Sequence, residues 1–146
     1  DDRELRREGM SYTVDTLAGL RAELGARVPI CLILGADAFL RLPAWSRWLQ
    51  LFELAHIAVA SRPGYALDEA IGQSPELNAQ WRNRGASDPG ACAGTPAGAI
   101  VRVAIPLLEI SASDLRARMS RGQSVRYLLP PAVVDYIAAH RLYRTQ

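Results

Sequence analysis

Short apolar runs alternate with segments of helical periodicity along this chain. Residues 28–34, 56–60 and 99–105 are apolar runs without the alternation of a half-buried strand, and they predict three strands. Apolar strands of this kind are typical of a parallel sheet that is covered on both faces. The predicted helices, which have apolar residues three to four apart, are residues 14–24, 45–52, 66–82, 112–121 and 131–142. The pattern therefore predicts an α/β fold with helices packed on a parallel sheet.

Capping residues indicate where two of the predicted helices begin or end. Thr13 is a suitable N-cap for the first helix, and Gly25 is a suitable stop. Ser111 can cap the helix that follows the third strand, and Asp114 can complete a capping box with it. Residues 85–98 are rich in Gly, Ala, Pro and Ser, which predicts a loop.

Polar or glycine residues follow each predicted strand, at residues 35–37, 61–64 and 110–111. Ligands of open α/β sheets bind beyond the carboxyl ends of the strands, so these segments are candidates for a binding site. Gly35 would let a ligand approach the backbone closely, and the carboxylate of Asp37 could accept hydrogen bonds from ribose hydroxyls. An ordinary turn would explain the same residues.

The segment from Ser111 to Arg116 is the strongest candidate for an anion site. A serine-capped helix start presents free N–H groups and a positive dipole end, and Arg116 lies about one turn further on. A capped helix with a solvated arginine is the alternative interpretation.

Aromatic and hydroxyl residues suggest a second set of contacts. Trp45 could stack on an aromatic ligand, whereas Trp48 is expected in the core. Thr13 could bind a carboxylate through its hydroxyl and amide, although capping alone would account for it.

Histidine and cysteine give no catalytic or metal-binding pattern. His56 and His140 have no partner at metal-ligand spacing, so structural roles are expected and no metal site is predicted. Cys31 is expected in the core of a strand, and Cys92 lies in the predicted loop without a nucleophile signature.

Composition narrows the class of protein. The 146 residues, of which 49% are hydrophobic, fit one globular domain spanning 1–146. No apolar stretch is long enough for a membrane span, no signal peptide is apparent, and two cysteines favour a cytoplasmic setting. A net charge of +2 is too small to indicate nucleic-acid binding, and no nucleic-acid partner is predicted. All 17 basic residues are arginine, so any anion site must use arginine side chains.

Several short segments occur along this chain in an order that resembles the motif order of one family, the bacterial nicotinate-nucleotide adenylyltransferases of the nucleotidyltransferase superfamily. The segments that carry the resemblance are Ser-Tyr-Thr-Val-Asp-Thr-Leu at 11–17, Leu-Gly-Ala-Asp at 34–37, Leu-Pro-Ala-Trp at 42–45, Arg-Pro-Gly-Tyr at 62–65 and Ile-Ser-Ala-Ser-Asp-Leu-Arg at 110–116. The ending, with Leu-Pro at 129–130 and Leu-Tyr at 142–143, also fits the family.

This resemblance implies a Rossmann-like nucleotidyltransferase fold and a reaction of NAD biosynthesis. ATP and nicotinate mononucleotide would be joined into deamido-NAD with release of pyrophosphate, and Mg²⁺ would accompany ATP. The resemblance assigns Trp45 to stacking on the pyridine ring, Thr13 and Ser46 to the nicotinate carboxylate, Gly35 and Asp37 to the nucleotide, Ser111 and Arg116 to the ATP phosphates, and Arg62 to the border of the substrate pocket. It leaves open whether the chain associates with copies of itself.

One family element is not found in this sequence. The family begins with a strand and a His-x-Gly-His loop, and neither histidine here has that pattern. By the resemblance, residues 1–146 form a nucleotidyltransferase domain that lacks its first strand and helix, and no catalytic residue is assigned. The alternatives are a relative that uses nicotinamide mononucleotide or phosphopantetheine as acceptor, and a non-catalytic nucleotide-binding fragment.

Overall fold

A computed structural model describes residues 1–61, 66–105 and 110–143 of the chain. The chain divides into two compact units, Asp1–Pro106 and Leu107–Gln146. They are referred to below as the first and the second unit.

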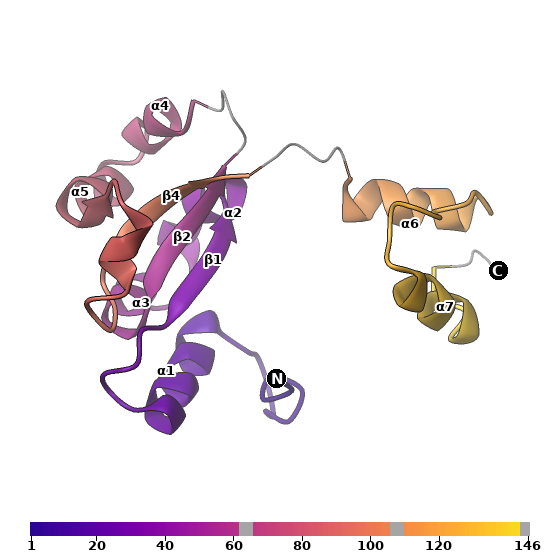
Figure 1. The fold of residues 1–146 in the computed structure, drawn as a ribbon, viewed down its shortest axis with the longest axis horizontal. Coiled ribbons are helices and arrows are strands. Elements are labelled where there is room, and N and C mark those ends of the chain that lie inside the picture. The colour runs from indigo at the N-terminus through magenta and orange to yellow at the C-terminus, as the bar shows by residue number, and fades with distance from the viewer. Residues whose placement is uncertain (62–65, 106–109, 144–146) are drawn as a thin grey trace. The chain divides into compact units, whose positions relative to one another are not determined.

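The first unit is built on a parallel sheet of four strands in the order β1-β2-β4-β3 (Figure 1). The strands are β1 (Cys31–Gly35), β2 (His56–Ser61), β3 (Gly85–Ala86) and β4 (Ile100–Ala104). The predicted α/β class with a parallel sheet is confirmed, and β1, β2 and β4 are the three predicted strands. The two-residue β3 lies in the segment predicted as a loop.

Helices precede and connect these strands, and some of them differ from the prediction. They are α1 (Thr13–Leu24), α2 (Ala36–Leu40), α3 (Leu51–Leu54), α4 (Leu67–Gly72), α5 (Pro75–Arg84) and three 3₁₀ turns, η1 (Leu42–Ala44), η2 (Trp48–Gln50) and η3 (Pro89–Cys92). The single helix predicted over 66–82 is wrong, because Ser74 interrupts it. Its Oγ accepts a hydrogen bond from the Leu77 N–H and so starts α5 anew, with Pro75 in the first turn.

The helix predicted over 45–52 is also wrong in form. Residue Arg47 adopts the left-handed conformation, with φ 51° and ψ 39°, between η1 and η2. A helix cannot pass through such a residue, so the predicted helix is replaced by the single 3₁₀ turn η2 and the start of α3.

The expected coverage of the strands on both faces holds for β2 but not for β1. Five of the six residues of β2 are buried. In β1, Cys31 is exposed and Ile33 is 73% exposed. β1 pairs with β2 alone among the described strands, and these side chains have no layer over them. The expected burial of Cys31 in the core is therefore wrong.

The core of the first unit lies between the sheet and its helices. Phe39, Leu42 and Phe52 are at most 1% exposed, and Trp48 packs edge-on against Phe52 with ring centroids 5.9 Å apart. The expected core role of Trp48 agrees with this contact.

Arg21 joins three segments at the end of the sheet where β1 begins. Its guanidinium donates hydrogen bonds to the carbonyl oxygens of Val28, Leu54 at 2.6 Å and Pro96 at 2.8 Å. The end of α1, the end of α3 and the loop before β4 are thereby fixed together (Figure 1).

His56 has the structural role that was expected of it. It is fully buried, its Nε2 lies 2.7 Å from the Thr95 carbonyl oxygen, and its Nδ1 accepts a hydrogen bond of 3.1 Å from the Ala99 N–H. Because Nδ1 acts as acceptor, the proton is on Nε2 and the imidazole is neutral. The ring thus ties the 95–99 segment to the first residue of β2.

Substitution of this histidine tests that role. His56→Leu leaves the Thr95 carbonyl and the Ala99 N–H without their partner, and we expect the free energy of unfolding to fall by about 2–4 kcal/mol. Urea denaturation measures the change. His140→Leu is the control, because His140 is exposed at the end of its helix and its replacement should cost under about 0.5 kcal/mol. Equal losses for the two variants would contradict the structural role of His56.

The second unit contains α6 (Ala112–Ser120) and α7 (Pro131–Ala139), with an isolated bridge between Arg126 and Leu129. Leu115 and Val125 are its buried apolar residues, and none of the residues of α7 is buried. In the described part of the chain, no helix has the length and apolar character needed to cross a membrane.

Candidate functional site

The start of α1 is open. Thr13 is its first residue rather than its cap, because the capping position falls on the extended Tyr12, and the expected cap role of Thr13 is wrong. The side chain of Tyr12 makes no capping hydrogen bond, and among the described residues nothing accepts from the N–H groups of Thr13 or Val14. Two free N–H groups at the positive end of a 12-residue helix favour a negatively charged ligand.

The turn after η1 carries two more predicted site residues. Trp45 is partly buried against the core, so part of its ring remains accessible, and Ser46 is exposed. The next residue, Arg47, donates from its guanidinium to Asp15 Oδ1 at 2.6 Å. Asp15 lies in the first turn of α1, two residues after Thr13. The structure therefore brings the start of α1 and the Trp45–Ser46 turn next to each other.

Gly35 and Asp37 lie at the carboxyl end of β1, as predicted. Gly35 pairs with Ala60 in register, and a Cβ added at Gly35 would meet no atom within 4 Å. Asp37 is exposed in the first turn of α2 and, among the described residues, makes no hydrogen bond or ion pair. Among the described residues, no hydrogen bond or ion pair joins Gly35 or Asp37 to Thr13, Trp45 or Ser46.

Arg62 was predicted to border the same site. It lies outside the described residues, as does the rest of the Arg-Pro-Gly-Tyr segment.

The second unit holds the two residues predicted for a phosphate site. Ser111 caps α6 as expected, since its Oγ accepts from the Asp114 N–H at 3.0 Å. The capping box is not completed, because the Asp114 carboxylate accepts from Arg118 Nε at 2.7 Å instead. Arg116 is exposed, and its guanidinium contacts only the Ser113 hydroxyl, at 3.3 Å, among the described residues. Its charge is available to an anion near the start of the helix.

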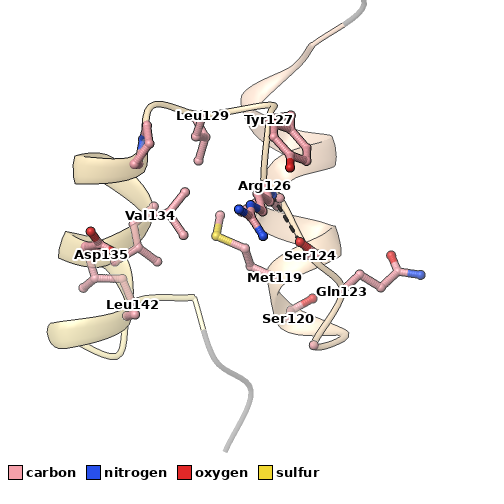
Figure 2. A pocket seen from close by; sticks show the side chains of 15 residues that line it. Met119, Ser120, Gln123, Ser124, Arg126, Tyr127, Leu129, Val134, Asp135 and Leu142 are labelled. Carbon is pink, nitrogen blue, oxygen red and sulfur yellow. Dashed lines mark hydrogen bonds between the residues drawn. The ribbon is translucent and has the colours of Figure 1, made fainter.

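A cavity of about 860 Å³ lies elsewhere in the second unit, between α6 and α7. Figure 2 shows the Met119 and Val134 side chains pointing into it from the two helices. Its lining begins at Met119, toward the end of α6, and includes neither Ser111 nor Arg116. The cavity is therefore distinct from the predicted phosphate site.

The Cys92 thiol is not activated, and the described residues contain no cluster of metal-ligating side chains. Burial, the neighbouring Cys31 and the charge of Asp88 raise the pKa of the Cys92 thiol, which disfavours the reactive thiolate. No group of three or more His, Cys, Asp or Glu side chains is close enough to hold a metal ion among the residues that the structure describes.

Arg47 is the residue that the sequence patterns did not reveal. The place of Asp15 in the first turn of α1 is explained locally by the helix dipole, and its partner Arg47 lies 32 residues away in the sequence. No local spacing rule connects residues so far apart. A glycine would have marked the left-handed position, but the sequence has arginine there.

Proteins similar in sequence to this chain carry the name of the family that its motifs resemble. The chain is 53% identical over 135 residues to a protein of Halorhodospira halophila named "Probable nicotinate-nucleotide adenylyltransferase". This match covers 91% of this chain and 59% of the relative. It is 48% identical over 145 residues to a Stenotrophomonas maltophilia protein of the same name, covering 99% of the chain and 64% of the relative. The chain thus spans about three fifths to two thirds of the length of these relatives. No family model matches the sequence.

Solved structures support the fold alone. The nicotinic acid mononucleotide adenylyltransferase of Plasmodium falciparum, solved in complex with NaAD, superposes with a TM-score of 0.61 at 20% identity. The match covers 93% of this chain and 58% of that one. The Rossmann-like nucleotidyltransferase architecture expected from the sequence is therefore confirmed.

Proposed function

We propose that this chain, which is related to the bacterial nicotinate-nucleotide adenylyltransferases over nearly all of its length, takes part in adenylyl transfer from ATP to nicotinate mononucleotide. In this reaction a phosphate oxygen of the mononucleotide attacks the α-phosphorus of ATP. The bond to the β-phosphate breaks, and deamido-NAD and pyrophosphate are the products. Positioning of the two phosphates and stabilisation of their charge supply most of the catalysis in such a transfer.

One observation carries the acceptor side of the proposal. The Arg47–Asp15 ion pair holds the open start of α1 against the Trp45–Ser46 turn, although these residues lie far apart in the sequence. Free N–H groups at a helix start suit a carboxylate, and an accessible indole suits an aromatic ring. We assign the nicotinate carboxylate to Thr13 and Ser46 and the pyridine ring to Trp45.

The remaining assignments concern the ATP phosphates and the substrate nucleotide, and each rests on residues of one unit. The capped start of α6 and the uncompensated charge of Arg116 suit phosphate, so we assign Ser111 and Arg116 to the ATP phosphates. The open backbone at Gly35 and the Asp37 carboxylate, which has no ion-pair partner in the described part of the chain, suit the nucleotide. Arg62 remains assigned to the pocket border by resemblance.

Mg²⁺ and the cellular setting complete the proposal. Mg²⁺ usually binds through substrate phosphates and a few carboxylates, so it is expected to arrive with ATP and to offset the charge of the phosphates. Such binding requires no cluster of protein ligands. We place the reaction in the cytoplasm, where ATP and pyridine nucleotide precursors are available.

Pyrophosphate release by the complete gene product tests the reaction. We expect release with ATP and nicotinate mononucleotide, and a kcat/KM at least about 10²-fold lower with nicotinamide mononucleotide, since the uncharged amide leaves the carboxylate contacts unpaired. Higher activity with nicotinamide mononucleotide or phosphopantetheine would establish a different acceptor. Binding of ATP by calorimetry without release from any acceptor would establish a non-catalytic nucleotide-binding module.

Trp45 gives a direct test of the ring assignment. Trp45→Ala should raise the KM for nicotinate mononucleotide by about tenfold or more through loss of stacking, and leave the KM for ATP unchanged. Steady-state kinetics with each substrate varied in turn measure both values. Trp48→Phe is the matched control, because an aromatic ring there keeps the packing against Phe52. A rise in both KM values for Trp45→Ala would contradict the assignment.

A further inference from the structure

The backbone at Arg47 is held in a conformation that its side chain does not favour. Its φ of 51° and ψ of 39° lie in the left-handed region, which non-glycine residues rarely adopt without a local reason. Arg47 lies between the extended Trp45 and the η2 turn, so the left-handed residue is the point at which the 3₁₀ turn begins. From this position the Arg47 side chain reaches Asp15 in α1. Among the described residues it forms no ion pair with any other charged group.

The ion pair contributes little to the stability of the fold. The Arg47 and Asp15 side chains are 48% and 35% exposed, and ion pairs with such exposure add little to the free energy of folding. Its consequence is instead geometric, because it joins the first turn of α1 to the Trp45–Ser46 turn across 32 residues of sequence. Both turns carry residues assigned above to the acceptor.

We propose that Arg47 is a positioning residue for the acceptor: through Asp15 it fixes the Trp45–Ser46 turn against the start of α1 and neutralises the Asp15 charge beside the carboxylate subsite. The inference rests on the proposed function and specifies how its carboxylate subsite is assembled. Arg47 itself is assigned no contact with the substrate.

The two partners are not equivalent in this role. Removal of Arg47 frees the turn and also leaves the Asp15 carboxylate unneutralised two residues from Thr13, where it repels a negatively charged acceptor. Removal of the Asp15 charge frees the turn but adds no repulsion. A purely structural pair would give equal effects for the two substitutions.

Kinetics of the complete gene product test this asymmetry. We expect Arg47→Gln to raise the KM for nicotinate mononucleotide by about tenfold or more. We expect Asp15→Asn to raise it by about two- to fivefold. In both variants kcat and the KM for ATP should stay within about twofold of wild type, and Arg47→Lys should recover most of the loss since it keeps the charge. Arg41→Gln is the control, because it makes the same charge change at an exposed residue of the neighbouring turn, and Arg41 forms no ion pair within the described part of the chain.

Hydrogen exchange separates this inference from the proposed function. In Asp15→Asn the hydrogen-bonded amides of residues 15–16 and 44–45 should exchange faster together, while those of β2 stay unchanged. Unchanged exchange in both segments, or an unchanged KM for the acceptor in Arg47→Gln, would overturn the positioning role. If the wild-type protein releases no pyrophosphate, the proposed function fails. The exchange data then decide alone whether Arg47 holds the two turns together.

Discussion

Arg116→Ala is expected to lower kcat/KM for ATP by about 10²–10³-fold, the loss typical of removing one group that stabilises phosphate charge in the transition state. Arg116 lies one turn into α6, and among the described residues its guanidinium contacts only the Ser113 hydroxyl. No carboxylate in that part of the chain competes for its charge, so the charge is available to ATP phosphates. Pyrophosphate release at varied ATP concentration measures the effect.

The same helix supplies the matched control for this substitution. Arg118 is bound to Asp114 through Nε at 2.7 Å, so its charge is already compensated. Arg118→Ala should therefore change kcat/KM for ATP by less than about threefold, in line with a partly exposed ion pair. Arg116→Lys should retain only part of the activity, since lysine keeps the charge but not the two parallel hydrogen bonds of arginine. Equal losses for Arg116→Ala and Arg118→Ala would contradict the assignment of Arg116.

The elements that the sequence predicted well are those fixed by local chemistry. Residues 57–60 of β2 form an unbroken apolar run, and burial on both faces is what such a run favours. Gly25 follows the last residue of α1 with φ 89°, and Ser111 caps α6. In each case one residue type meets one local requirement, so the residue suffices to predict the feature.

The features that were missed depend on contacts between distant segments. The exposure of Cys31 and Ile33 follows from the edge position of β1 in the sheet, which its apolar sequence does not reveal. The pairing of Arg47 with Asp15 depends on the packing of α1 beside α3 and the turn before it. The break before α5 is a different case, because the Ser-Pro pair at 74–75 is a recognisable helix start that helical periodicity over 66–82 obscured.

Phe39→Ala is expected to cause the largest loss of stability, about 3–5 kcal/mol, because it removes a buried aromatic ring and leaves a cavity. Phe39 is fully buried in α2, and its ring centroid lies 5.8 Å from that of Trp81 in α5. Phe39 therefore packs α2, the helix that follows Gly35 and carries Asp37, against α5. Figure 1 shows α5 on the β4 side of the sheet. Urea denaturation of the complete gene product, followed by tryptophan fluorescence, measures the loss.

Substitutions on the same helix separate loss of packing from loss of helix. Phe39→Leu keeps part of the volume, so it should cost less than half as much and remain measurable if the alanine variant fails to fold. Asp37→Ala changes an exposed neighbour and should cost under about 0.5 kcal/mol. Because α2 carries Asp37 and follows Gly35, partial loss of Phe39 packing should also raise the KM for nicotinate mononucleotide, whereas the KM for ATP changes less. A cost below about 1 kcal/mol for Phe39→Ala would show that this ring does not anchor α2, and the position of Asp37 would then need another support.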